Sequence, residues 1–209
     1  MKKILLFILL FIAIPAFADT MPFYTDAIPK ISIGLYQTDS EIFIYSHPDS
    51  NSKVIKTVKF SYNPEDMPNN MFAVLLNEKK LGFLYVTDIG DEGWVEVLYD
   101  KKLNLKGWVH LNDQMQFLPW RNFYNLYGKK YGLRLMKNIP KDLEVLRAKP
   151  EDLGQIVSTF NNYVKQIKLT VIRGNWALVS VMDLDKVPKT GFMKWRDIDG
   201  TIFAFPNIK

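Results

Sequence analysis

Histidines are the first residues to consider for chemistry in this chain of 209 residues. There are only two, His47 and His110, and neither has another histidine or a carboxylate at the spacing of a metal site. A Gly-x-Ser-x-Gly nucleophile motif and a glycine-rich phosphate loop are both absent from the sequence. We therefore expect the two histidines to be surface or turn residues, and we predict no metal or other cofactor.

Pairs of carboxylates are the next candidates, because two Asp or Glu residues suffice for glycoside hydrolysis. All of them lie in polar segments between expected strands, where acidic residues commonly stabilise turns. The pairs are Glu65 and Asp66, Asp91 and Glu92, Glu151 and Asp152, and Asp197 and Asp199. The last pair belongs to an expected hairpin turn, 197–200. We predict that the protein is not an enzyme, with a carboxylate hydrolase as the residual alternative.

The composition excludes further classes of chemistry. Without a single cysteine the chain has no thiol nucleophile, no disulfide and no Cys-based metal site. Its hydrophobic content of 48% and aromatic content of 14% indicate a folded protein rather than a disordered one. The formal net charge is only +5, and the basic residues alternate with acidic ones. A nucleic-acid-binding protein concentrates its basic residues on one face, so nucleic acid is not expected as a partner.

The first 18 residues have the pattern of a signal peptide. Lys2 and Lys3 precede an apolar run of 11 residues, 4–14, and a small-residue site, Ala16-Phe17-Ala18, follows. The run is shorter than the ~20 residues of a spanning helix, and no later run has membrane length. We predict cleavage between Ala18 and Asp19 and a secreted, periplasmic protein, with an uncleaved N-terminal anchor as the alternative.

Most of the remaining apolar residues alternate with polar ones or form short runs between Gly, Pro, Asn and Asp. This pattern is typical of β-strands and turns, and it predicts an all-β protein. The clearest expected strands are 41–45, 54–58, 83–86, 94–98, 167–171, 176–181 and 202–205.

An internal repeat divides the chain. With Pro48 aligned on Pro150, segments 44–48 and 54–58 match 146–150 and 156–160, and 31–33 matches 133–135. Further on, 93–97 resembles 175–179 and 107–109 resembles 191–193. The first copy is longer, which predicts an insertion at about 61–80.

The order of these segments is similar to that of the bacterial Src-homology-3-type (SH3-like) domain. The resemblance rests on the turn 45–48, the strand 54–58, Gly93-Trp94-x-x-Val97 and Gly107-Trp108-Val109. The second copy diverges, because Asn175 replaces the first glycine and Phe192 replaces the second tryptophan. The resemblance covers about 41–118 and 143–206. It implies two small β-barrels in tandem, 19–118 and 131–209.

A short helix is expected between the two copies, at 119–130. Pro119 is suited to a first helical turn and Gly128 to a helix end. The aromatic residues between them recur at helical spacing and share one face: Trp120, Phe123, Tyr124 and Tyr127. We interpret this face as the contact that joins the two barrels, with an aromatic ligand platform as the alternative.

Binding is the function that the resemblance favours, because barrels of this type can present aromatic side chains in a groove. The candidate ligand-binding residues are Tyr45, Tyr85, Trp94, Tyr99 and Trp108 in the first copy, and Trp176 and Trp195 in the second. The expected partner is a cell-wall peptide or glycan, or an envelope protein. The alternative is a structural or assembly subunit of an envelope complex without a small-molecule ligand. The oligomeric state is left open.

Overall fold

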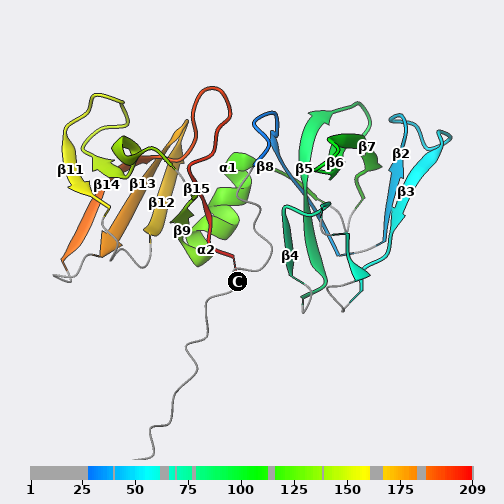
Figure 1. Cartoon of the computed structure of the whole chain (residues 1–209), viewed down its shortest axis with the longest axis horizontal. Helices are drawn as coiled ribbons and strands as arrows, with labels where there is room; N and C mark the ends of the chain where they lie inside the picture. The colour runs from blue at the N-terminus through cyan, green and yellow to red at the C-terminus, as the bar shows by residue number, and fades with distance from the viewer. Residues whose placement is uncertain are drawn as a thin grey trace, which may run out of the picture.

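The computed structural model describes residues 28–39, 41–61, 66–68, 70–76, 79–112, 116–137, 139–160, 167–182 and 187–208. The predicted signal peptide and its cleavage site lie outside these residues, as does Glu65 of the carboxylate pairs. The described chain forms two β-sheets at the two ends of the molecule, with one helical segment between them (Figure 1). The predicted all-β class is thereby confirmed.

The first sheet has eight strands. Seven of them follow the order β3-β2-β7-β6-β5-β1-β8, and β4 pairs with β5 beside this path. The strands are β1 (Gly34–Thr38), β2 (Ile42–Tyr45), β3 (Val54–Val58), β4 (Val74–Leu76), β5 (Leu81–Ile89), β6 (Trp94–Asp100), β7 (Leu105–His110) and β8 (Gln116–Pro119).

The second sheet repeats the first strand for strand. Its order is β11-β10-β14-β13-β12-β9-β15. Among the described residues only β4 lacks a counterpart there, and β4 lies in the predicted insertion. The strands are β9 (Leu133–Leu135), β10 (Val145–Arg147), β11 (Ile156–Thr159), β12 (Ile167–Arg173), β13 (Trp176–Met182), β14 (Pro188–Lys194) and β15 (Ala204–Pro206).

The register of the first hairpin is also repeated. Ile44 pairs with Lys56 and, after a bulge, Tyr45 pairs with Val54. The residues 102 positions later do the same: Leu146 pairs with Ser158 and, after the same bulge, Arg147 pairs with Ile156. Since bulges are specific local features of a fold, the shared bulge supports the predicted repeat independently of strand order.

Two glycines explain how the hairpin can approach the rest of each sheet. A Cβ on Gly107 would lie 2.4 Å from Ile44, and a Cβ on Gly191 would lie 3.0 Å from Cβ of Leu146. Both glycines therefore leave space for the same aliphatic position of the neighbouring strand. This close approach is the structural reason for the glycine in each copy of the Gly-aromatic motif.

The first strands of the two copies do not match as predicted. Tyr36 pairs with Leu84, and the equivalent pair in the second sheet is Leu133 with Ile167. Leu133 therefore corresponds to Tyr36 and not to Ile31. The shift arises because the connection to the next strand is longer in the second copy, where it includes the 3-10 turn Lys141–Leu143.

Neither strand path closes on itself. The end strands β3 and β8 do not neighbour one another in the first sheet, nor do β11 and β15 in the second. The described strands thus form two open sheets where closed barrels were expected. In the first sheet β8 pairs with β1 and not with β3, and in the second β15 pairs with β9 and not with β11, so β3 and β11 are left as free edges.

The connector is helical from Trp120 to Tyr131, in three parts: α1 (Trp120–Phe123), η3 (Tyr124–Gly128) and α2 (Lys129–Tyr131). Gly128 does not end it as predicted, since its φ is −67° and helical. The end is Gly132, with a φ of +77°. Gly128 is instead a site of close packing, because a Cβ there would lie 2.8 Å from Leu169.

The aromatic face of the connector is buried between the sheets, which supports the interpretation of a joining contact. Phe83 and Phe123 have ring centroids 5.7 Å apart, and those of Tyr124 and Trp195 are 4.3 Å apart. The hydroxyl of Tyr124 also donates a hydrogen bond to the Ala204 carbonyl. Residues of both sheets and the connector thus form one continuous hydrophobic core.

A second core lies within the first sheet. It consists of inward residues such as Val95 and Val97, and of Met67, Met71 and Phe72 from the insertion. The equivalent inner face of the second sheet is covered by the connector helix instead. The insertion and the connector therefore fill corresponding places in the two copies.

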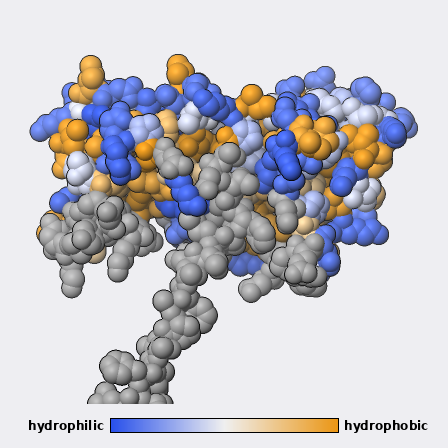
Figure 2. Space-filling view, viewed as in Figure 1, coloured by the Kyte–Doolittle hydropathy of each residue, from blue (hydrophilic) through white to orange (hydrophobic). Residues whose placement is uncertain are grey.

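Polar and apolar residues are mixed over the face shown in Figure 2, and neither kind gathers on one sheet alone. In the described part of the chain no helix is both long enough and apolar enough to cross a membrane.

Candidate functional site

Four aromatic side chains gather on the outer face of β2, β6 and β7: Tyr45, Trp94, Trp108 and His110. Side chains alternate along a strand, so Trp94 lies on the face opposite Val95 and Val97, which are in the core. Trp94 pairs with His110 across β6 and β7, and Tyr45 pairs with Trp108 across β2 and β7. We refer to these four residues as the outer aromatic cluster.

Three rings of the outer aromatic cluster, those of Tyr45, Trp94 and His110, contact one another edge to face. The centroid of Trp94 lies 5.3 Å from that of Tyr45 and 4.9 Å from that of His110. Trp94 is only 6% exposed, whereas Tyr45 and Trp108 are half-buried and His110 is exposed. Trp94 is thus the base of the cluster, and the other rings offer accessible surface around it.

The loops beside the cluster fix its shape. A Cβ on Gly90 would lie 2.9 Å from the ring of Trp108 and 3.3 Å from Cβ of Trp94, so the absence of a side chain at position 90 gives both tryptophans room. The carbonyl of Glu92 accepts a hydrogen bond from His110 Nε2 at 3.0 Å. The exposed His110 and the exposed turn residue His47 confirm the prediction of surface and turn histidines.

A small hollow of about 170 Å³ adjoins the outer aromatic cluster. Tyr45 and His110 line it together with the exposed side chain of Phe43 and the carboxylate-bearing Glu41. Its lining therefore combines aromatic rings with polar groups, those of Glu41, His110 and Asn112.

Glu96, the charged residue that pairs with Trp108, is hydrogen-bonded to other side chains of the first sheet. Glu96, the partner of Trp108 across the strands, accepts a hydrogen bond from Thr87 Oγ1 at 2.5 Å and one from Lys106 Nζ at 3.1 Å. These bonds hold Glu96 as a structural carboxylate on the same face.

The corresponding face of the second sheet is different. Arg147 stands in place of Tyr45 and donates a hydrogen bond to the Gly154 carbonyl at 2.8 Å. Phe192 stands in place of Trp108, and the guanidinium of Arg173 lies 5.8 Å from its ring centre. Lys194, in place of His110, binds both Asp152 and Asp197. Two of the four aromatic positions therefore hold charged side chains in the second sheet, while Trp176 and Phe192 keep aromatic rings in place of Trp94 and Trp108.

The other candidate binding residues lie elsewhere. Tyr85 and Trp195 are 1% and 3% exposed and belong to the core shared by the two sheets. Tyr99 is half-buried against the core of the first sheet, and Trp176 is half-buried at the start of β13. Of the seven candidates, the structure brings together Tyr45, Trp94 and Trp108.

The described carboxylate pairs lie in turns. The predicted turn 197–200 is present, with the backbone N–H of Gly200 bonded to the Asp197 carbonyl at 3.1 Å. The hydrogen bond from the Ile198 N–H lowers the pKa of Asp197, and the hydrogen bond from Lys30 lowers that of Asp199. A general acid requires a raised carboxyl pKa, so both shifts are opposite to that role. Nowhere in the described ranges do three potential metal ligands meet.

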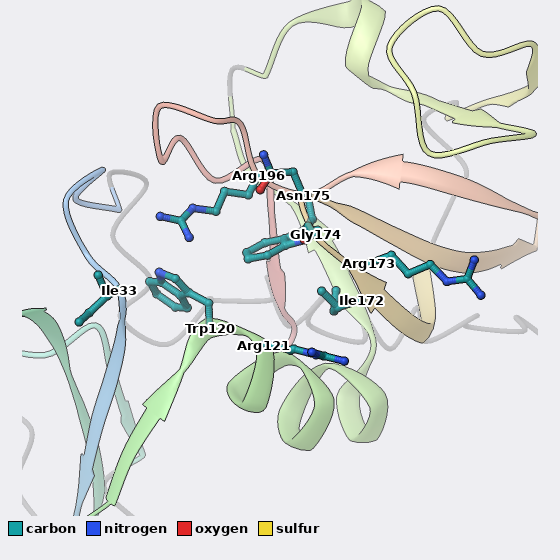
Figure 3. Close-up of a pocket in the computed structure, with 9 residues that line it drawn as sticks. Ile33, Trp120, Arg121, Ile172, Arg173, Gly174, Asn175 and Arg196 are labelled. Carbon is teal, nitrogen blue, oxygen red and sulfur yellow. The ribbon is translucent and has the colours of Figure 1, made fainter.

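A larger crevice, of about 490 Å³, lies where the two sheets and the connector meet (Figure 3). The crevice could not be predicted from the sequence, because its lining comes from four segments that are separated along the chain: 33, 120–121, 172–175 and 195–196. The only signal in the sequence was the recurrence of arginine beside tryptophan, at Trp120-Arg121 and Trp195-Arg196.

Comparison with known proteins adds no further constraint: no protein-family model and no curated protein matches this chain.

Proposed function

We propose that this chain is a non-catalytic binding protein of the bacterial envelope that holds a cell-wall peptide or glycan on the outer aromatic cluster. The observation that carries the proposal is the convergence of Tyr45, Trp94 and Trp108 on one outer face. Partly exposed aromatic rings provide flat surfaces on which sugar rings or proline-containing peptides can stack.

Two further inferences belong to this proposal. The repeated strand order supports reading each sheet as an open, divergent form of the Src-homology-3-type domain, a domain common in secreted and envelope proteins. The basic, apolar and small-residue pattern of 1–18 supports export to the periplasm, where a cell-wall ligand is accessible.

The first copy is the binding copy in this proposal. Its outer face has three aromatic rings in contact and an adjoining hollow. In the second copy Arg147 and Lys194 bind groups of their own sheet. A ligand there would have to displace these intramolecular contacts.

A sedimentation assay with purified peptidoglycan tests the proposal on the mature chain, 19–209. We expect saturable binding that Trp108→Ala and Tyr45→Ala each weaken about tenfold or more, because stacking on one aromatic ring, as known for nucleic-acid bases, contributes on the order of 1–3 kcal/mol. Met182→Ala is the matched control, since Met182 is an exposed apolar residue of the second sheet.

Circular dichroism establishes that the variants are folded before they are compared. The proposal is wrong if the wild-type chain does not sediment with peptidoglycan. It is equally wrong if the folded Tyr45→Ala and Trp108→Ala variants bind as well as Met182→Ala.

The edge strands favour a second candidate function, that of an assembly subunit. β3 and β11 are the free edges at the outer ends of the molecule, and both carry exposed aliphatic residues. These are Val54 and Ile55 on β3, and Ile156 and Val157 on β11. Because an unpaired apolar edge can accept a strand from another chain, this function predicts a stoichiometric partner protein that co-purifies with the chain.

A further inference from the structure

Three of the residues that line the crevice between the sheets are arginines. Arg121, Arg173 and Arg196 all line it, and no Asp or Glu does. We propose that this crevice is a binding site for a small polyanion, one that carries at least two separate carboxylate or phosphate groups. The proposal concerns a different surface from the outer aromatic cluster and does not depend on the function proposed for that cluster.

The charges of these arginines are not neutralised within the part of the chain that the structure describes. No carboxylate there forms an ion pair with any of the three. The nearest acidic residues in the sequence, Asp197 and Asp199, are bound to Lys194 and Lys30. A guanidinium offers a planar fork of donors that fits the two oxygens of a carboxylate or phosphate group.

The arginines divide between two sides of the crevice. Arg196 extends toward Ile33 and Trp120, whereas Arg121 and Arg173 lie on the side of Ile172 (Figure 3). The side chain of Arg173 points outward there, and its guanidinium lies 5.8 Å from the ring centre of Phe192 at the outer end of the crevice. One Arg196 N–H group reaches the carbonyl of Ser32 at 3.5 Å, a long contact that a ligand oxygen can replace. This separation is the reason for expecting two anionic groups rather than one.

Apolar surface lies between the charges. The indole N–H of Trp120 donates to the Ser32 carbonyl at 2.8 Å, and that of Trp195 donates to the Gly174 carbonyl at 2.9 Å. Both polar edges are therefore already bonded, and each ring contributes only apolar surface to the crevice wall. Ile172 adds to that surface. A ligand with a carbon skeleton between its anionic groups matches this arrangement.

The dimensions suit a small molecule. A volume of about 490 Å³ falls within the range of ~300–1,000 Å³ typical of small-molecule sites. Such sites also occur preferentially at the junction of two structural units, where this crevice lies. The half-buried Asn175 adds an amide, with donors and an acceptor, at the same place.

Tryptophan fluorescence provides the test, because Trp120 and Trp195 line the crevice. The mature chain, 19–209, is titrated with the peptide Glu-Glu-Glu and, separately, with tripolyphosphate; the peptide Gln-Gln-Gln is the neutral control. We expect a saturable change with at least one anion and none with Gln-Gln-Gln. The double variant Arg121→Gln/Arg173→Gln should weaken that binding at least tenfold.

A charge-matched variant separates a site from general attraction. Lys102→Gln/Lys168→Gln removes the same two charges at exposed positions outside the crevice and should bind like the wild type. Preference for Glu-Glu-Glu would assign a carboxylate ligand and preference for tripolyphosphate a phosphate ligand. The proposal is overturned if neither anion gives saturable binding, or if both double variants weaken binding equally.

Discussion

At the scale of single residues, buried titratable groups determine how stability should change with pH. Burial lowers the pKa of Lys101 to about 8, and its Nζ donates a hydrogen bond to the Phe72 carbonyl. Burial raises the pKa of Tyr36 and Tyr124 well above the ordinary value of 10.0. The lysine and the tyrosines therefore act in opposite directions in alkaline solution.

Between about pH 8 and pH 10.5 the unfolded chain holds the Lys101 proton that the folded chain has released, so this group makes the protein more stable as the pH rises. Above about pH 10 the unfolded chain loses tyrosine protons that the folded chain retains, so stability falls. We expect the free energy of unfolding to rise from about pH 8 and to reach its maximum near pH 10. Urea unfolding at a series of pH values measures this profile.

Lys101→Met provides the control for that profile, because methionine keeps an unbranched apolar chain without the charge. In this variant the free energy of unfolding should no longer rise above pH 8, but it should still fall above pH 10. A rise of unchanged size in Lys101→Met would show that another group causes it.

At the scale of elements, the connector helix is the most sensitive part of the fold. Phe123 is fully buried and contacts Phe83 on one side and Phe205 on the other. Phe123→Ala should lower the free energy of unfolding by about 3–5 kcal/mol, because a large cavity would open between the two sheets. Urea denaturation monitored by circular dichroism measures the difference.

The same helix supplies the control for that substitution. Leu126 is 52% exposed, so Leu126→Ala should change stability by less than about 0.5 kcal/mol. If the two alanine variants proved equally stable, the connector would not be the centre of the shared core.

Local patterns predicted those elements whose form is set within a few residues. The match of Pro48 to Pro150 predicted two hairpins, and even their bulges coincide. The alternation along the expected strand 94–98 is enough to place Trp94 opposite Val95 and Val97, because the period of a strand is fixed by its backbone.

Features that depend on distant neighbours could not be predicted in this way. Tyr85 and Trp195 were expected beside Tyr45 and Trp108, but both are buried in the core that the two sheets share with the connector. Gly128 has the sequence features of a helix end, yet its role comes from Leu169, which packs against it from another strand. The arginine crevice requires four segments to meet, and their meeting depends on how the two copies dock.

At the scale of the whole molecule, the two sheets are joined by a second contact besides the connector. Lys30, before the first strand of the first sheet, forms a 2.5 Å ion pair with Asp199 of the turn 197–200. Gly200 in the same turn has a φ of +91°, and a Cβ there would lie 2.1 Å from the Lys30 carbonyl oxygen. The backbones of the two copies can therefore approach this closely only with glycine at position 200.

Gly200→Ala tests whether the two sheets unfold as one unit. We expect it to lower the free energy of unfolding by about 2–4 kcal/mol, because it combines an unfavourable φ with a backbone clash. Since one core runs through both sheets, hydrogen exchange should show the same loss of protection in β5 and β6 as in β12 and β13.

Gly174→Ala separates the effect of the unfavourable φ from that of the backbone clash. Gly174 also has a positive φ, +56°, but a Cβ there would meet nothing within 4 Å. It should therefore cost only the backbone strain, on the order of 1–2 kcal/mol. The additional loss in free energy of unfolding in Gly200→Ala, compared with Gly174→Ala, then measures the effect of the close contact with Lys30. Loss of protection confined to the second sheet in Gly200→Ala would mean that the two copies are stable separately, in spite of their shared core.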